Sequence, residues 1–210
     1  MGFKNSRFIF HLKNFLSCSH RTGVFVHIPK TAGHSVGRVL GKGKFRWIGH
    51  DLRNPSYLFP KDISWFGDLY SCAFVRNPYD RLVSSYYYLK SGGNCEADQH
   101  DFDYYLRKYK NFEDMILNWN DDLFNQIHFK PQSEWIYFDN KCLFNFVGRY
   151  ENLQQDVNKI LIDNQMNTRY VKTCNKSKHK NYTKYYNKTT SKLVYDIYET
   201  DFKNFGYNKL

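Results

Sequence analysis

Hydrophobic residues occur along the chain in short runs that are separated by polar turns. The runs Gly23–Ile28 and Leu69–Val75 are almost uninterrupted and rich in β-branched and aromatic residues. Such short runs are typical of strands that are covered on both faces. Leu143–Val147 is a third strand candidate. The pattern therefore predicts three buried strands.

Helical patterns lie between and after these strands. Ser35–Leu40 is expected to open one helix, and a second is expected to begin at Pro78, with Asn77 as its N-cap, and to stop before Gly92. Further helices are expected over Phe102–Trp119 and Gln132–Phe138, and the apolar positions 153, 157, 160 and 161 indicate an amphipathic helix. A last helix is expected over Leu193–Phe205, with Leu193, Ile197 and Phe205 facing inward. Residues 175–190 are expected to form an exposed polar segment. Alternation of strands and helices predicts an α/β fold with a parallel sheet.

The composition indicates one globular domain with an excess of positive charge. The chain has 210 residues, 41% of them hydrophobic and 19% aromatic, which suffices for a core without disulfides. We assign residues 1–22 to an N-terminal extension and residues 23–210 to a single domain. The formal net charge of +11 favours an anionic partner, although dispersed lysines in the C-terminal part are equally typical of a solvated surface.

The cysteines and the N-terminal residues bear on the compartment. The five cysteines form no CxxC pair, which favours reduced thiols over a disulfide framework or a metal site. The first apolar patch is interrupted by His11, Lys13 and Asn14, so it fits neither a signal peptide nor a transmembrane segment. We expect a cytoplasmic protein of bacterial type, or a protein of the Golgi lumen if the sequence is part of a longer eukaryotic chain.

The first chemical motif joins the first strand to the first helix. Its sequence, HIPKTAGHS (27–35), places a tight turn and a helix N-terminus directly after a buried strand. That order directs backbone N–H groups and the positive end of the helix dipole at one point. Lys30 adds a cation, and Thr31 and Ser35 add hydroxyl donors. The motif predicts a phosphate cradle, but not a Walker A loop, because its lysine precedes its glycine.

The second motif, FVRNPYDRLVS (74–84), joins the second strand to the second helix. Arg76 leaves the end of the strand, and Ser84 lies two turns into the helix, roughly 10 Å further on at 1.5 Å per residue. Arginine can bridge much of that distance, so both groups could hold one phosphate. The alternative is that Arg76 and Arg81 only form ion pairs with Asp80 and surface acids.

Together these motifs resemble the 5′-phosphosulfate loop and the 3′-phosphate motif of PAPS-dependent carbohydrate sulfotransferases, the family of heparan sulfate 2-O-sulfotransferases and many small bacterial relatives. The family sequences HIPKTAGTS and FVRNPxDRxxSxY correspond here to HIPKTAGHS (27–35) and FVRNPYDRLVSSY (74–86). The segments HFKPQ (128–132), FVGRYEN (146–152) and YETDFKNFGY (198–207) resemble family segments in the same order. The resemblance covers nearly all of residues 23–207 and implies a P-loop-like three-layer fold, in which helices flank a central parallel β-sheet.

The resemblance implies transfer of a sulfuryl group from PAPS (3′-phosphoadenosine 5′-phosphosulfate) to a carbohydrate hydroxyl by in-line displacement, with no metal. Lys30 would neutralise the bridging oxygen of the leaving 3′,5′-ADP. The residues implied to bind the 5′-phosphate and sulfate are Lys30, Thr31, Ala32, Gly33, His34 and Ser35, and those implied to bind the 3′-phosphate are Arg76 and Ser84. His34 stands where the family usually has threonine, so cofactor affinity or its pH dependence is expected to differ.

An acceptor hydroxyl needs a general base. His50 lies between the two motifs, where relatives place a catalytic histidine, and an unperturbed histidine can accept a proton near neutral pH. The alternative for His50 is a surface histidine. His128 and Gln132 are candidates for the acceptor pocket and equally for ordinary helix-end residues. The implied partner is a carbohydrate, including an anionic glycan, and no nucleic acid.

Two other functions stay open as alternatives. A P-loop-like nucleotide or sugar kinase would bind phosphate, but the chain lacks the Walker spacing and a Mg²⁺-binding carboxylate after a strand. A non-catalytic polyanion-binding protein could use lysine and tyrosine side chains, but it leaves both anion motifs unexplained. The sequence therefore favours the sulfotransferase.

Overall fold

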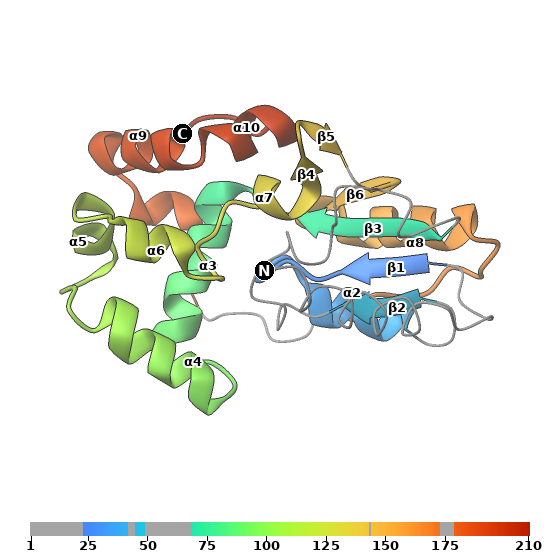
Figure 1. The fold of residues 1–210 in the computed structure, drawn as a ribbon, viewed down its shortest axis with the longest axis horizontal. Coiled ribbons are helices and arrows are strands. Elements are labelled where there is room, and N and C mark those ends of the chain that lie inside the picture. The colour runs from blue at the N-terminus through green and yellow to red at the C-terminus, as the bar shows by residue number, and fades with distance from the viewer. Residues whose placement is uncertain (1–22, 42–44, 49–68, 143, 173–178) are drawn as a thin grey trace, which may run out of the picture.

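The computed structural model describes residues 23–41, 45–48, 69–142, 144–172 and 179–210. A four-stranded, all-parallel sheet lies at the centre of this part, with helices on both of its faces (Figure 1). The predicted α/β class and the flanked parallel sheet are confirmed. The predicted N-terminal extension, residues 1–22, lies outside the described residues.

The sheet has the strand order β2-β1-β3-β6, so β1 lies between β2 and β3. Its strands are β1 (Gly23–Val26), β2 (Phe45–Ile48), β3 (Tyr70–Val75) and β6 (Phe146–Arg149). The first two predicted strands are confirmed, and the third lies a few residues further along than expected. Strand β2 was not predicted, because Arg46 interrupts its short apolar run and only its two end residues are buried.

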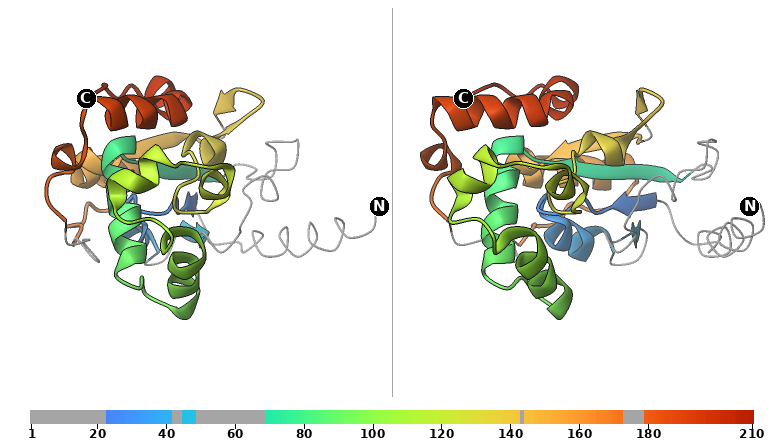
Figure 2. Two further views of the ribbon diagram at one scale, coloured as in Figure 1. Left: turned by 90° about the vertical axis from the view of Figure 1, so that its left-hand side faces the viewer. Right: turned by 60° about the vertical axis from the view of Figure 1, so that its left-hand side comes forward.

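Alternate residues of the strands face two different helical layers. On one face, Phe25 and Phe74 pack with residues of α2 (Gly33–Leu40) and α8 (Leu153–Asp163). On the other face, Val26 and Ala73 pack with residues of α7 (Ser133–Ile136) and α10 (Glu199–Phe205). Figure 2 shows the C-terminal helices stacked on one side of the sheet. The three-layer arrangement that the sequence predicted is therefore present.

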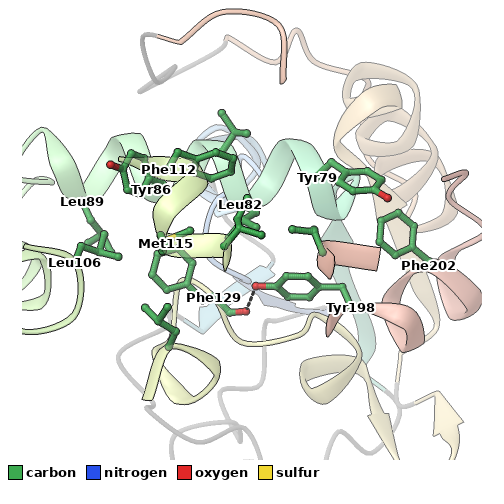
Figure 3. Close-up of a cluster of buried hydrophobic side chains, with 14 residues drawn as sticks. Tyr79, Leu82, Tyr86, Leu89, Leu106, Phe112, Met115, Phe129, Tyr198 and Phe202 are labelled. Atoms are coloured by element: carbon green, nitrogen blue, oxygen red, sulfur yellow. Dashed lines mark hydrogen bonds between the residues drawn. The ribbon is translucent and has the colours of Figure 1, made fainter. Parts of the chain in front are cut away.

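A second core, rich in aromatic residues, forms around α3 (Pro78–Lys90) and is drawn in Figure 3. Tyr79, Leu82 and Tyr86 of α3 pack there with residues of α5 (Phe112–Leu117) and of the C-terminal helices. The buried hydroxyl of Tyr198 donates to the carbonyl of Phe129 over 2.6 Å, so its polar end is satisfied. Figure 1 shows α3 beyond the carboxyl ends of β1 and β3, so this second core lies at that end of the sheet.

The expected start of α3 is confirmed in detail. The side chain of Asn77 accepts a hydrogen bond from the N–H of Tyr79, and Pro78 occupies the first helical position. The helix ends at Lys90, directly before Gly92 and Gly93, which both have positive φ. The local sequence thus fixes both ends of the helix that carries Arg81 and Ser84.

The region from 96 to 142 is more divided than the sequence suggested. The expected helix over 102–119 is a series of short elements, because Asn111 caps a new helix by accepting from the N–H of Asp114. The expected helix over 132–138 ends at Ile136, after which two residues form a strand. The elements are α4 (Glu96–Asp101), the π-helical turn η3 (Phe102–Leu106), α5, α6 (Asp121–Asn125), α7, and the antiparallel pair β4 (Tyr137–Phe138) and β5 (Lys141–Cys142).

The C-terminal region also differs from the expected single helix over 193–205. It contains the 3₁₀ turn η5 (Tyr182–Tyr185) and two helices, α9 (Lys188–Ile197) and α10, which are separated at Tyr198. Earlier in the chain, another 3₁₀ turn, η4 (Tyr150–Asn152), precedes α8. A capping box at Asn187 starts α9 inside the segment predicted as a polar loop. Phe205 is buried as expected, whereas Leu193 and Ile197 are only partly buried beside Val194. None of the helices in the described part of the chain is long and apolar enough to cross a membrane.

Candidate active site

The two sequence motifs meet at the carboxyl ends of β1 and β3. These strands are parallel neighbours, so the segments that follow them emerge at the same edge of the sheet. The guanidinium of Arg76 donates through Nη1 to the carbonyl of Lys30 over 3.1 Å. The structure therefore joins the predicted cradle and the predicted second motif by a direct contact.

The turn after β1 has an unusual backbone. Lys30 and Ala32 both have left-handed conformations, with φ values of 69° and 67°, although neither is glycine. Each such residue costs about 1–2 kcal/mol. Thr31 lies between them, and its hydroxyl donates to the carbonyl of Ile28 over 2.9 Å. Left-handed residues in a turn direct successive N–H groups toward one concave point, which suits an anion.

The N-terminus of α2 contributes to the same point. The first amides of any helix have no acceptor within the helix. Here the N-cap residue is Ala32, whose side chain cannot accept a hydrogen bond from them. The side chain of Ser35 is buried in the first turn. The helix start thus has no capping side chain, an arrangement that is compatible with an anion at this point.

The ring of His27 packs closely under the cradle. An added Cβ at Gly33 would lie 1.7 Å from Cδ2 of His27, so only glycine fits at that position. His34 contacts the His27 ring edge-on, with 5.4 Å between ring centroids, and contacts Trp47 in the same manner at 5.3 Å. His34 thus belongs to an aromatic cluster beside the cradle.

We expect Gly33→Ala to lower the free energy of unfolding by about 1–3 kcal/mol, because the new methyl group overlaps the His27 ring. Urea unfolding followed by circular dichroism measures this change. Gly37→Ala is the matched control on the same helix, since its Cβ would lie no closer than 3.2 Å to Trp47, a residue that is 40% exposed, whereas the contact at Gly33 is 1.7 Å. Equal losses in both variants would contradict the close packing of His27 on Gly33.

Arg76 is held at the end of β3 by several groups. Its side chain pairs with Asp80 through Nε and Nη2, over 2.9 and 2.8 Å, and lies 4.1 Å from the ring centroid of Tyr150. The sequence alternative of an Arg76–Asp80 pair is therefore present. The same guanidinium also contacts the cradle, and arginine has five N–H donors, so the pair with Asp80 leaves capacity for an anion.

Ser84 lies on the same face of α3 as Asp80, the partner of Arg76. Asp80, Ser84 and Tyr88 follow one another at intervals of four residues, which places them on one helix face. Arg76 contacts Asp80 at the start of this face, and Lys30 Nζ lies 3.7 Å from the ring centroid of Tyr88 at its end. Ser84, which is buried, thus lies along the helix between a guanidinium and an ammonium group.

Lys30 is partly buried and lies near a second cation. Burial, together with the charge of Arg76, lowers the pKa of Lys30 from 10.5 to about 7, although Asp98 acts in the opposite direction. A lysine with this pKa changes its charge in the physiological range. Titratable groups with strongly shifted pKa values are more frequent at functional sites than elsewhere.

Arg81 is a residue whose role the sequence did not indicate. It is 2% exposed and donates to the carbonyls of Pro29 and Lys130, over 3.0 and 2.8 Å. It therefore ties the start of the cradle to the segment after α6, instead of pairing with Asp80 as the alternative supposed. The sequence feature that could have indicated a buried role for Arg81 is its position on the inward face of α3, one turn after Asn77.

The remaining predicted residues lie behind the cradle or outside the described part of the chain. Gln132 is fully buried, and its side-chain amide forms hydrogen bonds in both directions with the backbone of Arg76, over 2.8 and 2.9 Å. His128 is also buried, with its ring 5.3 Å from that of Tyr88. His50 lies outside the described residues. The described part contains no group of three or more His, Cys, Asp or Glu side chains suited to hold a metal ion.

The fold and the cradle first define a class: an α/β protein with groups for an anion at the carboxyl ends of its central strands. Comparison with family models then matches residues 13–208 to the sulfotransferase family. This match spans nearly the whole chain, and the chain belongs to that family. Comparisons with curated proteins and with solved structures gave no significant match.

Proposed function

We propose that this protein transfers a sulfuryl group from PAPS to a hydroxyl of a carbohydrate. The contact between the Arg76 guanidinium and the carbonyl of Lys30 carries the proposal. It supports one shared phosphate site, because the guanidinium that contacts the first motif has further N–H donors for an anion. A nucleotide with phosphate groups on both its 5′ and 3′ oxygens would engage the cradle and Arg76 together. That double engagement separates PAPS from ordinary nucleotides.

The proposed roles follow from the positions of the groups. Thr31, Ala32, Gly33, His34 and Ser35 bind the 5′-phosphate and the sulfate through amides and hydroxyls, and Arg76 and Ser84 bind the 3′-phosphate. As the acceptor oxygen bonds to sulfur, the bond from sulfur to the bridging oxygen breaks and its electron pair stays on that oxygen. The ammonium of Lys30 neutralises this charge. The acceptor proton passes to a general base, for which His50 is the candidate.

His128 and Gln132 fit a supporting role better than contact with the acceptor. Both are buried, and the Gln132 amide is already engaged with the backbone of Arg76. The acceptor is a glycan, and the net charge of +11 suits one that already carries carboxylates or sulfates. The described cysteines Cys72, Cys95 and Cys142 are free thiols, which supports a reducing compartment such as the cytoplasm.

Calorimetric titration with 3′,5′-ADP, 5′-AMP and ATP–Mg²⁺ tests the proposal. We expect 3′,5′-ADP to bind about 100-fold more tightly than 5′-AMP, because charge-assisted hydrogen bonds to the 3′-phosphate contribute about 1.5–3 kcal/mol each. Transfer from PAPS to candidate glycans is then measured directly. A preference for ATP–Mg²⁺ would favour the kinase, and absence of nucleotide binding would favour the polyanion-binding protein.

Arg76→Ala shows whether the preference arises where we place it. This variant should lose most of its preference for 3′,5′-ADP over 5′-AMP, since Arg76 is one of the two residues that we propose bind the 3′-phosphate, and its lost contacts with Asp80 and Lys30 affect both nucleotides alike. Arg107→Ala is the control, because Arg107 is an exposed arginine paired with Asp103 far along the chain from the cradle. A preference that persists in Arg76→Ala would move the 3′-phosphate site elsewhere.

A further inference from the structure

A network of polar side chains lies directly behind the ammonium group of Lys30. Lys30 Nζ rests on the face of Tyr88, 3.7 Å from the ring centroid. The hydroxyl of Tyr88 donates to Oδ2 of Asp98 over 2.6 Å. A phenol that donates to a carboxylate has a more electron-rich ring, which strengthens the attraction for a cation above it. Asp98 thus acts on Lys30 through Tyr88 as well as through its own charge.

Asp98 is held firmly as an anion. It is 7% exposed, and it also accepts from the N–H of Asn94 over 2.8 Å and from Sγ of Cys95 over 3.4 Å. Burial acts to raise its pKa, but the hydrogen bonds from Tyr88 and Asn94 outweigh burial and lower it. Burial and Asp98 together raise the pKa of Tyr88, so the phenol keeps its proton and remains the donor.

The second oxygen of Asp98 faces His128. Nε2 of His128 lies 4.0 Å from Oδ1 of Asp98. Gln126 donates from Nε2 to Asp101 and accepts from the His128 N–H through Oε1, which fixes the orientation of its amide. The same Nε2 faces Nδ1 of His128 at 3.2 Å, so Nδ1 accepts and the neutral ring carries its proton on Nε2. His128 therefore presents a donor to Asp98.

Within the part of the chain that the structure describes, Lys30 has no comparable ionic partner. None of the ion pairs among the described residues involves Lys30. The described groups that act on it are the guanidinium of Arg76, with Asp80 paired to it, the ring of Tyr88 and the charge of Asp98. Asp98 is the only one of them that directly favours the protonated lysine by its charge, because Asp80 is already engaged by Arg76.

We propose that Asp98 is a positioning residue for Lys30. It fixes the Tyr88 ring on which the ammonium rests, and its charge increases the fraction of Lys30 that is protonated before the nucleotide arrives. Binding of an anionic nucleotide then replaces Asp98 as the main negative partner and draws a proton onto Lys30 wherever it is still neutral. Nucleotide affinity therefore depends on pH through the protonation of Lys30, and Asp98 sets the pH above which the affinity falls. The nucleotide part of this inference rests on the proposed function, whereas the link between Asp98 and Lys30 does not.

The first experiment measures the titration of Lys30 in the free protein. Competitive labelling of amines with acetic anhydride from pH 5.5 to 9.5, read by mass spectrometry, gives the midpoint for the Lys30 peptide. We expect a midpoint near the pKa of about 7 in the unaltered protein. Asp98→Asn should lower this midpoint by about one pH unit, since it removes a nearby opposite charge. Glu96→Gln is the matched control, because it removes an exposed charge from the same helix.

The second experiment measures the affinity for 3′,5′-ADP over the same pH range. In the unaltered protein the affinity should fall above the midpoint of Lys30, because a neutral amine attracts the anion less. Asp98→Asn should bind about tenfold more weakly at pH 8 and within a few-fold at pH 5.5, where Lys30 is largely protonated in both proteins. Titration of the nucleotide's own phosphates is common to all variants and cancels in the comparison.

The outcomes separate the two proposals. An unshifted Lys30 midpoint in Asp98→Asn overturns the positioning role, whether or not nucleotide binds. A uniform loss of affinity at every pH also overturns it, since a merely structural role would act in that way. A shifted midpoint in a protein that binds no 3′,5′-ADP supports the positioning role and overturns the proposed function. Tyr88→Leu removes the ring and should lower the midpoint as well, while Tyr88→Phe keeps the ring and should not abolish the effect of Asp98.

Discussion

Lys30→Met is expected to reduce sulfuryl transfer by about 10²–10³-fold and, at the same time, to stabilise the fold. The loss of activity follows from its proposed role, since removing one group that stabilises developing charge has this order of effect. The stabilisation follows from the cradle, which holds an amine among buried groups and beside Arg76. Such a trade between activity and stability is typical of residues retained for function.

The pH dependence of that stabilisation has a definite sign. The pKa of Lys30 is about 7 in the folded protein and 10.5 when unperturbed, so the unfolded chain binds the proton more tightly. The resulting destabilisation is fully present below pH 7 and disappears as the pH rises toward 10.5. Lys30→Met should therefore raise the unfolding free energy most at pH 6 and least above pH 10. Urea unfolding at these two pH values measures the difference.

Lys90→Met is the matched control for Lys30→Met. Lys90 is an exposed lysine at the end of α3, and its Nζ lies 5.6 Å from the ring centroid of Tyr86. The same substitution there should change neither transfer nor the pH profile of stability by a measurable amount. A Lys30→Met variant that is less stable at pH 6 than the unaltered protein would show that Lys30 is a structural residue.

The parts of the fold that were predicted are those in which local sequence dominates. Strands β1 and β3 are almost uninterrupted apolar runs, and the start of α3 is fixed by Asn77 and Pro78, so short-range patterns suffice. The cradle and Arg76 follow directly from these elements, because parallel strands bring their carboxyl ends together. Their contact could be expected from the sequence, and Arg76 indeed reaches the carbonyl of Lys30.

The parts that were not predicted depend on contacts between distant segments. Strand β2 pairs with β1 although its own sequence contains Arg46. Asp98 was not a candidate, because nothing near position 98 shows that it meets Tyr88 and His128. Gln132 was a candidate for the acceptor pocket and equally for a helix-end residue, and nothing near position 132 shows that its amide reaches across 56 positions to the backbone of Arg76. The pattern of residues in a single sequence does not show which distant segments will contact each other.

Arg81 is the strongest example of such a contact, and Arg81→Met is expected to lower the unfolding free energy by about 3–5 kcal/mol. Arg81 is buried, and one of its guanidinium nitrogens, Nη2, has no hydrogen-bond partner among the described residues. Its charge nevertheless compensates the fully buried carboxylate of Asp201. Removing one of two compensating buried charges leaves the other uncompensated, which is strongly destabilising. Chemical denaturation at pH 7.5 measures the loss.

Two comparisons identify Asp201 as the cause of that loss. Burial raises the pKa of Asp201 despite hydrogen bonds from Ser133 and Gln132 and the charge of Arg81, all of which lower it. A carboxyl group with a raised pKa destabilises the fold increasingly as the pH rises above its unfolded value, so the loss in Arg81→Met should be smaller at pH 5 than at pH 7.5. The double variant Arg81→Met/Asp201→Asn should recover part of the stability. Equal losses at both pH values would contradict a role for Asp201.

Stability and nucleotide affinity should then separate in the double variant. Asp201→Asn removes the uncompensated charge, but it cannot restore the hydrogen bond from Arg81 to the carbonyl of Pro29 at the start of the cradle. The double variant should therefore regain stability while its affinity for 3′,5′-ADP stays about tenfold reduced, since one buried hydrogen bond contributes about 0.5–1.5 kcal/mol and also sets the position of Lys30. Arg107→Met, at an exposed ion pair, should change neither property. Full recovery of affinity would show that Arg81 serves the core alone, whereas a persistent deficit would show that the buried guanidinium also shapes the cradle.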